Sequence, residues 1–217
     1  MTEPYYRDDA VTLYHGDCLE VTEWLAADVL VTDPPYGIGY DRNAGKHRHD
    51  NHRTNLAVAG DAEPFDPAHL LAFKRAVIFG GNCFSSRLPD SPQWIVWDKV
   101  TRNGLDVRIA ECEIAWTRGV IGRTRMIRHM WSGAFRDSER GVSDHPTQKP
   151  LVVMQWIVEL ASKSGDVIAD PYAGSGSTLV AAKYLGRRAI GVELEERYCE
   201  IAAKRLAQGV LDFGGVA

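Results

Sequence analysis

Four consecutive residues place a carboxylate, two rigid prolines and an aromatic ring directly after a short apolar run: Asp33, Pro34, Pro35 and Tyr36. The Asp33 carboxylate can accept a hydrogen bond from an amino group, and Pro34 keeps its carbonyl acceptor although it has no N–H. The prolines stiffen the turn, because each fixes its own φ and restricts the residue before it. Tyr36 offers a flat face to a planar ring. This tetrad, residues 33–36, suits the holding of a flat, weakly nucleophilic amine for attack on an electrophile, or it is simply a rigid turn.

Acidic residues recur at one structural position along the chain. Asp17, Asp33, Asp170 and Glu193 each follow a short apolar run that reads as a β-strand. If those strands are parallel, all four acids lie at the carboxyl ends, where open α/β sheets bind their ligands. The pattern therefore predicts a site for a hydroxylated, cationic or amine-bearing ligand.

A turn with two glycines carries the sequence Asp-Pro-Tyr-Ala-Gly-Ser-Gly-Ser-Thr from residue 170 to residue 178. Glycines let the backbone approach a ligand closely, and a helix N-terminus offers free N–H groups to an anion. Leu179 stands where a dinucleotide site needs its third glycine, and no lysine follows Gly176 as in a phosphate-binding P-loop. This glycine turn, residues 170–178, therefore suits a smaller anion, such as an amino-acid carboxylate.

Glu193 ends the next apolar run, where a nucleoside-binding α/β unit places an acid to hold ribose hydroxyls. The alternative interpretation is a helix N-cap acid, because Leu194, Glu195 and Glu196 follow it. A ligand with a carboxylate and a ribose, and without need of a pyrophosphate site, fits S-adenosylmethionine (AdoMet).

Apolar runs rich in β-branched residues alternate with helical patterns, which indicates βαβ units and a mainly parallel sheet. We expect strands at 11–14, 29–32, 76–79, 94–97, 112–116, 167–169 and 189–192, with a further short strand at 126–131. We expect helices at 19–26, 67–73, 151–162, 177–185 and 195–207. The helix at 151–162 should face the core, because one stripe of it is apolar: Leu151, Met154, Ile157, Val158 and Ala161.

The composition describes one ordinary globular domain over residues 1–217, with 45% hydrophobic and 25% charged residues. No apolar run approaches the roughly 20 residues that span a bilayer. The start of the chain is polar and acidic, so we expect no secretory signal. The four cysteines are scattered and form no C-x-x-C pair, which argues against a disulfide framework or a zinc site and favours a cytoplasmic protein.

Two long polar segments, 37–64 and 119–145, are candidates for gripping a substrate, because ordinary connections are shorter. Both carry many basic side chains, although the net charge of the chain is −4. Either they are solvated loops or they contact a polyanion such as DNA. The candidate DNA contacts are Arg42, Lys46, Arg48, Arg123, Arg125 and Arg128. No cysteine or carboxylate set at matching spacing accompanies the histidines of the first segment, so we expect no metal site at His47, His49 and His52.

Three motifs in this order resemble the β-class DNA amino-methyltransferases, which methylate N6 of adenine or N4 of cytosine. They are the tetrad, then His145-Pro146-Thr147-Gln148-Lys149-Pro150, then the glycine turn with Glu193. Their order, with the tetrad first and the glycine turn last, is the permuted order of that class. The resemblance covers about residues 12–206.

The resemblance implies the class I AdoMet-dependent methyltransferase fold, which is Rossmann-like. Its mostly parallel, seven-stranded sheet is flanked by helices and is here circularly permuted. The strand ending at Asp170 would be first in the logic of the sheet, followed by the strands ending at Glu193, Asp17 and Asp33. The segments 94–97 and 112–116 would supply the closing pair, one of them antiparallel.

The resemblance also implies roles for single residues. Asp33 and the Pro34 carbonyl would accept hydrogen bonds from the target amine, while Tyr36 stacks on the extruded base. The cofactor site would comprise Asp17 near the adenosine, Thr147 and Lys149 near the carboxylate, Gly174 and Gly176 along the methionine part and Glu193 on the ribose. Its remaining members would be Asp170, Tyr172, Ser175 and Ser177.

The implied activity is site-specific methylation of an exocyclic amine in double-stranded DNA, with the base flipped out of the duplex. Asp33 favours N6 of adenine, because the family's adenine enzymes usually carry Asp at this position and its cytosine enzymes usually carry Ser. N4-cytosine methylation is the alternative, and an AdoMet- or DNA-binding module without catalysis is the second. The segment 119–145 is short for a target-recognition domain. The chain is compatible with a homodimer and with a cognate restriction enzyme.

Overall fold

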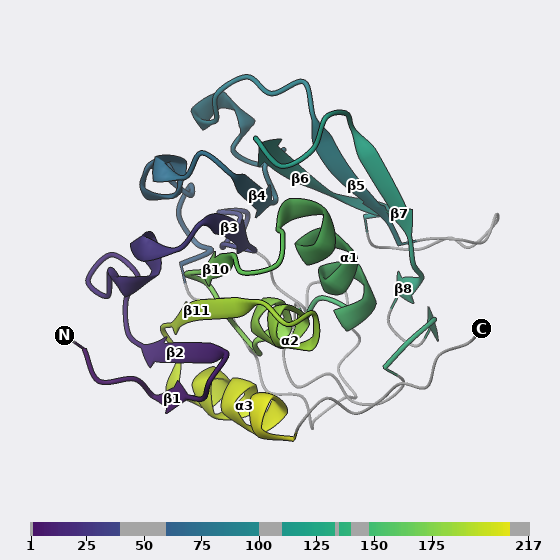
Figure 1. The fold of residues 1–217 in the computed structure, drawn as a ribbon. Coiled ribbons are helices and arrows are strands. Elements are labelled where there is room, and N and C mark those ends of the chain that lie inside the picture. The colour runs from purple at the N-terminus through teal and green to yellow at the C-terminus, as the bar shows by residue number, and fades with distance from the viewer. Residues whose placement is uncertain (1, 40–59, 100–109, 133–134, 140–147, 209–217) are drawn as a thin grey trace, which may run out of the picture.

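Residues 2–39, 60–99, 110–132, 135–139 and 148–208 are described by the computed structural model (Figure 1). Their main sheet has nine strands in the order β1-β2-β11-β10-β3-β4-β6-β5-β7, and β8 pairs with β9 in a separate hairpin. The bounds are β1 Tyr6–Arg7, β2 Val11–His15, β3 Val29–Thr32, β4 Ala76–Phe79, β5 Trp94–Asp98, β6 Cys112–Arg118, β7 Arg125–Arg128, β8 Trp131–Ser132, β9 Phe135–Arg136, β10 Val167–Asp170 and β11 Arg188–Glu193.

The central strands β2, β11, β10, β3 and β4 run parallel to one another. β6 is antiparallel to both β4 and β5, and β7 lies parallel to β5 at the edge. The predicted fold class, the permuted strand order and the antiparallel member of the closing pair are confirmed. The expected count of seven strands is too low, because the short strands β1 and β7 extend the two edges of the sheet.

The two faces of the sheet are covered differently. The helices α1 (Leu151–Ala161), α2 (Ser177–Tyr184) and α3 (Glu196–Ala207) pack against one face, and Figure 1 shows α1 and α2 in front of the central strands. Side chains of β3 alternate between the faces, since Val29 and Val31 join the core under these helices while Leu30 joins the core on the other side. A strand buried on both faces reads as an unbroken apolar run, which is the pattern seen in the sequence.

The apolar stripe of α1 is buried as predicted. Leu151, Met154, Ile157, Val158 and Ala161 are at most 8% exposed. Each α-helix begins and ends within one residue of its predicted bounds. None of the helices in the described ranges is long and apolar enough to cross a membrane.

The helices predicted at 19–26 and 67–73 are wrong in type and length. The structure has short 3₁₀ helices there, η1 (Glu23–Ala26) and η2 (Ala68–Ala72), and a third, η3 (Ser85–Arg87). Asp17 accounts for the first difference, because its side chain accepts the N–H of Leu19 and its carbonyl accepts those of Glu20 and Val21. Such local hydrogen bonds compete with a regular helix. The second segment likewise begins with a tight turn, in which Leu70 donates to the Pro67 carbonyl.

Candidate active site

The tetrad and the glycine turn lie side by side at one edge of the sheet. β3 and β10 are neighbouring parallel strands, with Leu30 paired to Ala169, so the residues that follow both strands emerge at the same edge. Thr32, the last residue of β3, donates a hydrogen bond of 2.7 Å to Asp170, the last residue of β10. Two motifs that are far apart in the sequence are therefore neighbours in the structure.

The tetrad is held in one conformation by hydrogen bonds at both ends. The Tyr36 hydroxyl donates to Asp33 Oδ1 over 2.8 Å. Asp61 Oδ1 accepts the backbone N–H groups of Tyr36 at 2.9 Å and of Gly37 at 2.8 Å. Asp61 is only 4% exposed. Asp61 was not singled out in the sequence. The feature that could have identified it is an acidic residue near the end of the long polar segment 37–64.

Lys149 joins the tetrad to a second carboxylate. Its ammonium contacts Asp33 Oδ2, lies 3.1 Å from Glu113 Oε2 and is 7% exposed as a side chain. Lys99 lies 2.9 Å from the other oxygen, Glu113 Oε1. The backbone carbonyl of Lys149 accepts a hydrogen bond of 3.0 Å from Ser177 in the glycine turn. Lys149 thus touches both halves of the site, and its predicted contact with a cofactor carboxylate stays a prediction.

Glu113 and Lys99 were not singled out in the sequence. Glu113 lies within β6, among otherwise largely apolar neighbours, and Lys99 directly follows β5. A charged residue inside an apolar strand pattern is the signal that could have found Glu113. Its strand had been expected, but nothing in the sequence pairs it with a lysine that lies in another motif.

Burial and pairing set the charges of this cluster. Burial lowers the pKa of Lys149, but Asp33 and Glu113 outweigh it and leave the pKa raised. Burial raises the pKa of Glu113, but Lys149 and Lys99 outweigh that and leave it lowered. Burial raises the pKa of Asp33, Lys149 opposes part of the rise and Glu113 adds to it.

The glycine turn is fixed by Glu193. Glu193 Oε2 accepts the N–H of Gly174 at 2.7 Å, and Oε1 accepts the N–H of Glu195 at 2.8 Å. Glu195, and not Glu193, is the N-cap residue of α3, which corrects the alternative interpretation of Glu193. Burial raises the pKa of Glu193, and the two backbone N–H groups oppose the rise.

The turn needs its glycines for conformation and for space. Gly174 has a φ of 52° and Gly176 a φ of 79°, which are values that favour glycine. A Cβ at Gly176 would lie 2.9 Å from the Cβ of Ala202 in α3. Arg205, also in α3, donates to the carbonyl of Ser175 at 2.7 Å. Sequence reasoning missed this arginine, because it comes 30 residues after its partner.

Asp170, the first residue of the glycine turn, is a buried carboxyl bonded to the end of β3. It is 2% exposed, and burial raises its pKa to about 6 although the hydroxyls of Thr178 and Thr32 oppose the rise. The neighbouring Tyr172 has its hydroxyl 2.9 Å from His69 Nε2 and its ring edge-on to Phe65 at 5.7 Å. Asp17 is exposed after β2. Asp170 ends β10 and Asp17 follows β2, so both acids lie at the carboxyl ends of parallel strands as the sequence predicted.

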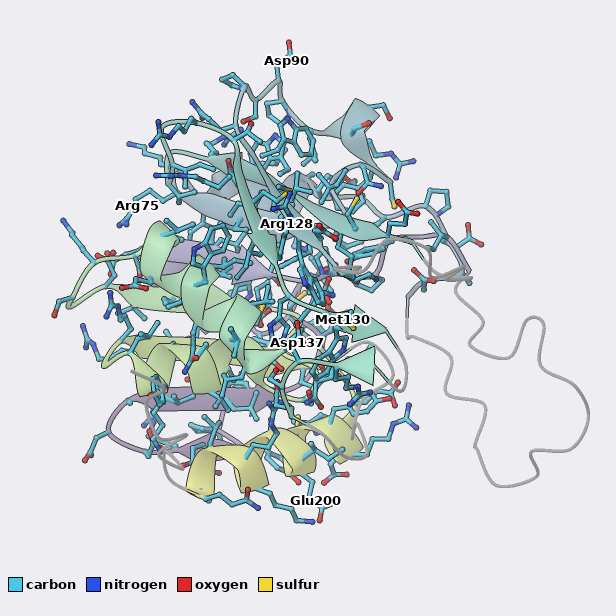
Figure 2. The ribbon with its side chains drawn as sticks, turned by 90° about the vertical axis from the view of Figure 1, so that its right-hand side faces the viewer. Arg75, Asp90, Arg128, Met130, Asp137 and Glu200 are labelled. Carbon is cyan, nitrogen blue, oxygen red and sulfur yellow. The ribbon has the colours of Figure 1, made fainter. Side chains whose placement is uncertain are left out.

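The basic residues predicted to contact DNA separate into two groups. Arg123, Arg125 and Arg128 are exposed, and Arg128 lies 3.3 Å from Asp98. Figure 2 turns this side of the molecule toward the viewer, with Arg128 above the β8–β9 hairpin. The other basic residues predicted to contact DNA lie outside the described ranges: Arg42, Lys46 and Arg48. Thr147 of the predicted cofactor site and the histidines His47, His49 and His52 also lie outside them.

The strand directions place Arg128 on the same side of the sheet as the tetrad, which is the edge formed by the carboxyl ends of the parallel strands. β5 is parallel to β4, because both are antiparallel to β6, and β7 is parallel to β5. The carboxyl end of β7, at Arg128, is therefore on the same edge as that of β3, whereas Arg125 starts β7 on the opposite side. Among the described residues, no group of three or more His, Cys, Asp or Glu could hold a metal ion.

Comparisons with known proteins agree with this geometry. The family model N6_N4_Mtase, described as DNA methylase, matches residues 96–204, which is 109 of the 217 residues. The type II methyltransferase M2.LlaDCHI of Lactococcus lactis subsp. cremoris is 25% identical over 261 residues, an alignment that covers 96% of this chain and 94% of the relative.

Two solved structures share the fold. The M1.HpyAVI–SAM complex aligns over 90% of this chain and 98% of its own, with a TM-score of 0.53 and 22% identity. The cytosine-N4-specific PvuII DNA methyltransferase aligns over 97% and 91%, with a TM-score of 0.63 and 14% identity. The family match over half of the chain, with the tetrad and the glycine turn meeting at one edge of a permuted sheet, shows that the chain belongs to the N6/N4 DNA methylase family.

Proposed function

We propose that the protein transfers the methyl group of AdoMet to N6 of adenine in double-stranded DNA. The observation that carries this proposal is the adjacency of the tetrad and the glycine turn, joined by the hydrogen bond from Thr32 to Asp170. One motif suits the amine and the other suits the methyl donor. Transfer requires the two to be neighbours, because the reacting atoms must come within about 3–3.5 Å of each other.

The residues of the glycine turn fit AdoMet. Gly174 and Gly176 leave the backbone bare at the start of α2, where a carboxylate is favoured. Each oxygen of Glu193 accepts one backbone N–H, so each keeps a further lone pair for a ribose hydroxyl. The AdoMet complex of M1.HpyAVI, a structure with the same fold, supports this assignment. AdoMet supplies an electrophilic methyl group on a positively charged sulfur.

The tetrad would prepare the amine. The lone pair of an exocyclic amine is delocalised into the base, so the amine attacks poorly unless it is oriented. Asp33 and the Pro34 carbonyl accept its two N–H groups and turn the lone pair toward the methyl, while Tyr36 stacks on the base. Asp33 also stabilises the positive charge that develops on the nitrogen. The bond from nitrogen to methyl forms as the bond from sulfur to methyl breaks, and the amine then loses one proton to solvent.

The DNA must present an unpaired base to this edge of the sheet. Flipping a base out of a duplex costs a few kcal/mol, which phosphate contacts can offset. Arg128 is located for such a contact, since it is exposed at the edge that carries the tetrad. Arg123 and Arg125 extend the basic surface along β7.

The whole chain acts in this proposal as one catalytic domain over residues 1–217, with the segments 37–64 and 119–145 on the DNA. A cytoplasmic location fits the four cysteines, all of which are free thiols in the structure. A homodimer and a cognate restriction enzyme are the further partners in this proposal.

The choice of base is tested by the product. Purified protein is incubated with labelled AdoMet and with DNA from a host that lacks adenine and cytosine-N4 methylation, and the DNA is digested to nucleosides. The proposal predicts label in N6-methyl-2′-deoxyadenosine alone. Label in N4-methyl-2′-deoxycytidine would assign the enzyme to cytosine, as in the PvuII enzyme, and an absence of label would leave a binding module without catalysis.

A further inference from the structure

Both oxygens of the Asp33 carboxylate are engaged within the protein. The Tyr36 hydroxyl donates to Oδ1 at 2.8 Å, and the Lys149 ammonium donates to Oδ2. Each oxygen keeps a further lone pair, so the amine can donate to Asp33 without displacing either donor. The Lys149 ammonium nevertheless opposes the transfer, because its positive charge lies beside the positive charge that develops on the amine, and its flexible side chain allows it to move away.

Glu113 Oε2 lies where it can receive the displaced ammonium. It is 3.1 Å from Lys149 Nζ, close enough for an ion pair, and this buried atom accepts no hydrogen bond in the structure. A small movement of the ammonium from Asp33 toward Glu113 would satisfy that oxygen.

Glu113 is itself held in place. Its other oxygen lies 2.9 Å from Lys99 Nζ, and Glu113 is paired with Trp97 in the β5–β6 ladder. The backbone of Lys149 is held in turn by the Ser177 hydroxyl. The ammonium can therefore change carboxylates while neither backbone moves.

We propose that Glu113, held by Lys99, is a positioning residue that takes the Lys149 ammonium from Asp33 when the target amine binds. This inference rests on the proposed methyl transfer. Before the exchange the ammonium bridges both carboxylates; afterwards Lys149 pairs with Glu113, and the amine donates to Asp33 Oδ2. Every buried charge stays paired throughout, whereas removal of one partner from a buried ion pair is strongly unfavourable.

The test is Glu113→Gln, which keeps the shape of the side chain and removes its charge. Without that charge the ammonium stays on Asp33, so methyl transfer at saturating DNA and AdoMet should fall by about tenfold to a hundredfold. The affinity for AdoMet, measured by calorimetry, should stay within about twofold of wild type. The matched control is Glu111→Gln, the same change at an exposed residue just before β6.

The pH profile separates this role from a merely structural one. The charged and titratable groups facing Asp33 are Lys149, Glu113, Tyr36 and Asp170. Because the Glu113 charge raises the pKa of Asp33, Glu113→Gln should move the acid limb of the transfer rate to lower pH while the plateau falls. A loss of packing alone lowers the plateau and leaves the limb where it is. Glu113→Asp retains the charge and should recover part of the plateau.

Unchanged transfer in Glu113→Gln, or a fall with no acid shift of the limb, overturns the inference. If that variant does not fold, Lys99→Gln serves instead, since it frees Glu113 and should lower the plateau with AdoMet affinity retained. Wild-type transfer is measured alongside. Active wild type with an unaffected Glu113→Gln rejects this inference alone, whereas inactive wild type rejects the proposed function and the inference with it.

Discussion

The backbone of Gly80 lies directly against the ring of Tyr36. A Cβ at Gly80 would come within 2.2 Å of the ring carbons Cδ1 and Cε1, and the residue has a φ of 68°. Gly80 follows the last residue of β4, and its N–H is bonded to the carbonyl of Ile114 in β6 at 3.0 Å. The end of β4 therefore fixes where the Tyr36 ring lies, although neither residue belongs to the other's motif.

Gly80→Ala should displace the Tyr36 ring and lower methyl transfer by about tenfold or more, because misplacement of a substrate-orienting group is costly. AdoMet affinity should change little. The matched control is Gly186→Ala, which has the same φ of 68° and nothing within 4 Å of an added Cβ. Both variants suffer the backbone strain and only Gly80→Ala suffers the clash. Equal transfer rates in the two variants would show that the clash is harmless.

Asp170→Asn should alter how stability depends on pH. Burial raises the pKa of Asp170 from 3.8 to about 6, so the folded state binds more protons than the unfolded state between these values. Stability of the wild type therefore falls as pH rises from about 4 to about 6, by up to about 3 kcal/mol for this group. The variant does not titrate, so its stability relative to wild type should grow across that window in urea unfolding.

Asp166→Asn should change the pH dependence of stability in the opposite direction, because the pKa of Asp166, just before β10, is lowered whereas that of Asp170 is raised. Burial raises the pKa of Asp166, but the Lys163 N–H and Arg75 outweigh it and leave the pKa lowered. Asp166 thus contributes stability at neutral pH that is lost in acid, and Asp166→Asn should be less stable than wild type at pH 7. The same pH trend in both variants would contradict the assignment of these pKa directions.

Glu193→Gln should weaken AdoMet binding by about tenfold, since an amide cannot accept both backbone N–H groups and also hold ribose hydroxyls. Duplex binding, followed by fluorescence anisotropy, should stay near wild type. Retained AdoMet affinity in a folded variant would remove Glu193 from the cofactor site.

Replacing Arg123, Arg125 and Arg128 by alanine should weaken DNA binding and reduce the slope of log affinity against log salt. Each lost phosphate contact lowers the magnitude of that slope by about 0.9. Because Arg128 shares the edge of the tetrad, it should account for most of the change when replaced alone. Arg188→Ala, at the exposed amino end of β11, is the control. An unchanged slope in the triple variant would remove β7 from the interface.

Features that depend on the local order of residues could be predicted from the sequence, whereas contacts between residues far apart in the chain could not. Asp33, Asp170 and Glu193 could be placed at strand ends because apolar runs precede them, and parallel strands end at one edge. Glu113 and Lys99 could not be assigned to the site, because their link to Asp33 passes through Lys149, which belongs to a third motif. The helix expected at 19–26 failed because the turn at Asp17 outcompeted it.

The central claim is that the tetrad acts on an amine delivered next to AdoMet at the same edge of the sheet. The most direct measurement compares wild type and Asp33→Ala in transfer of labelled methyl to DNA, with AdoMet affinity determined for both. The account predicts that Asp33→Ala loses transfer while its AdoMet affinity stays within about a few-fold of wild type. Transfer by Asp33→Ala at the wild-type rate would contradict it.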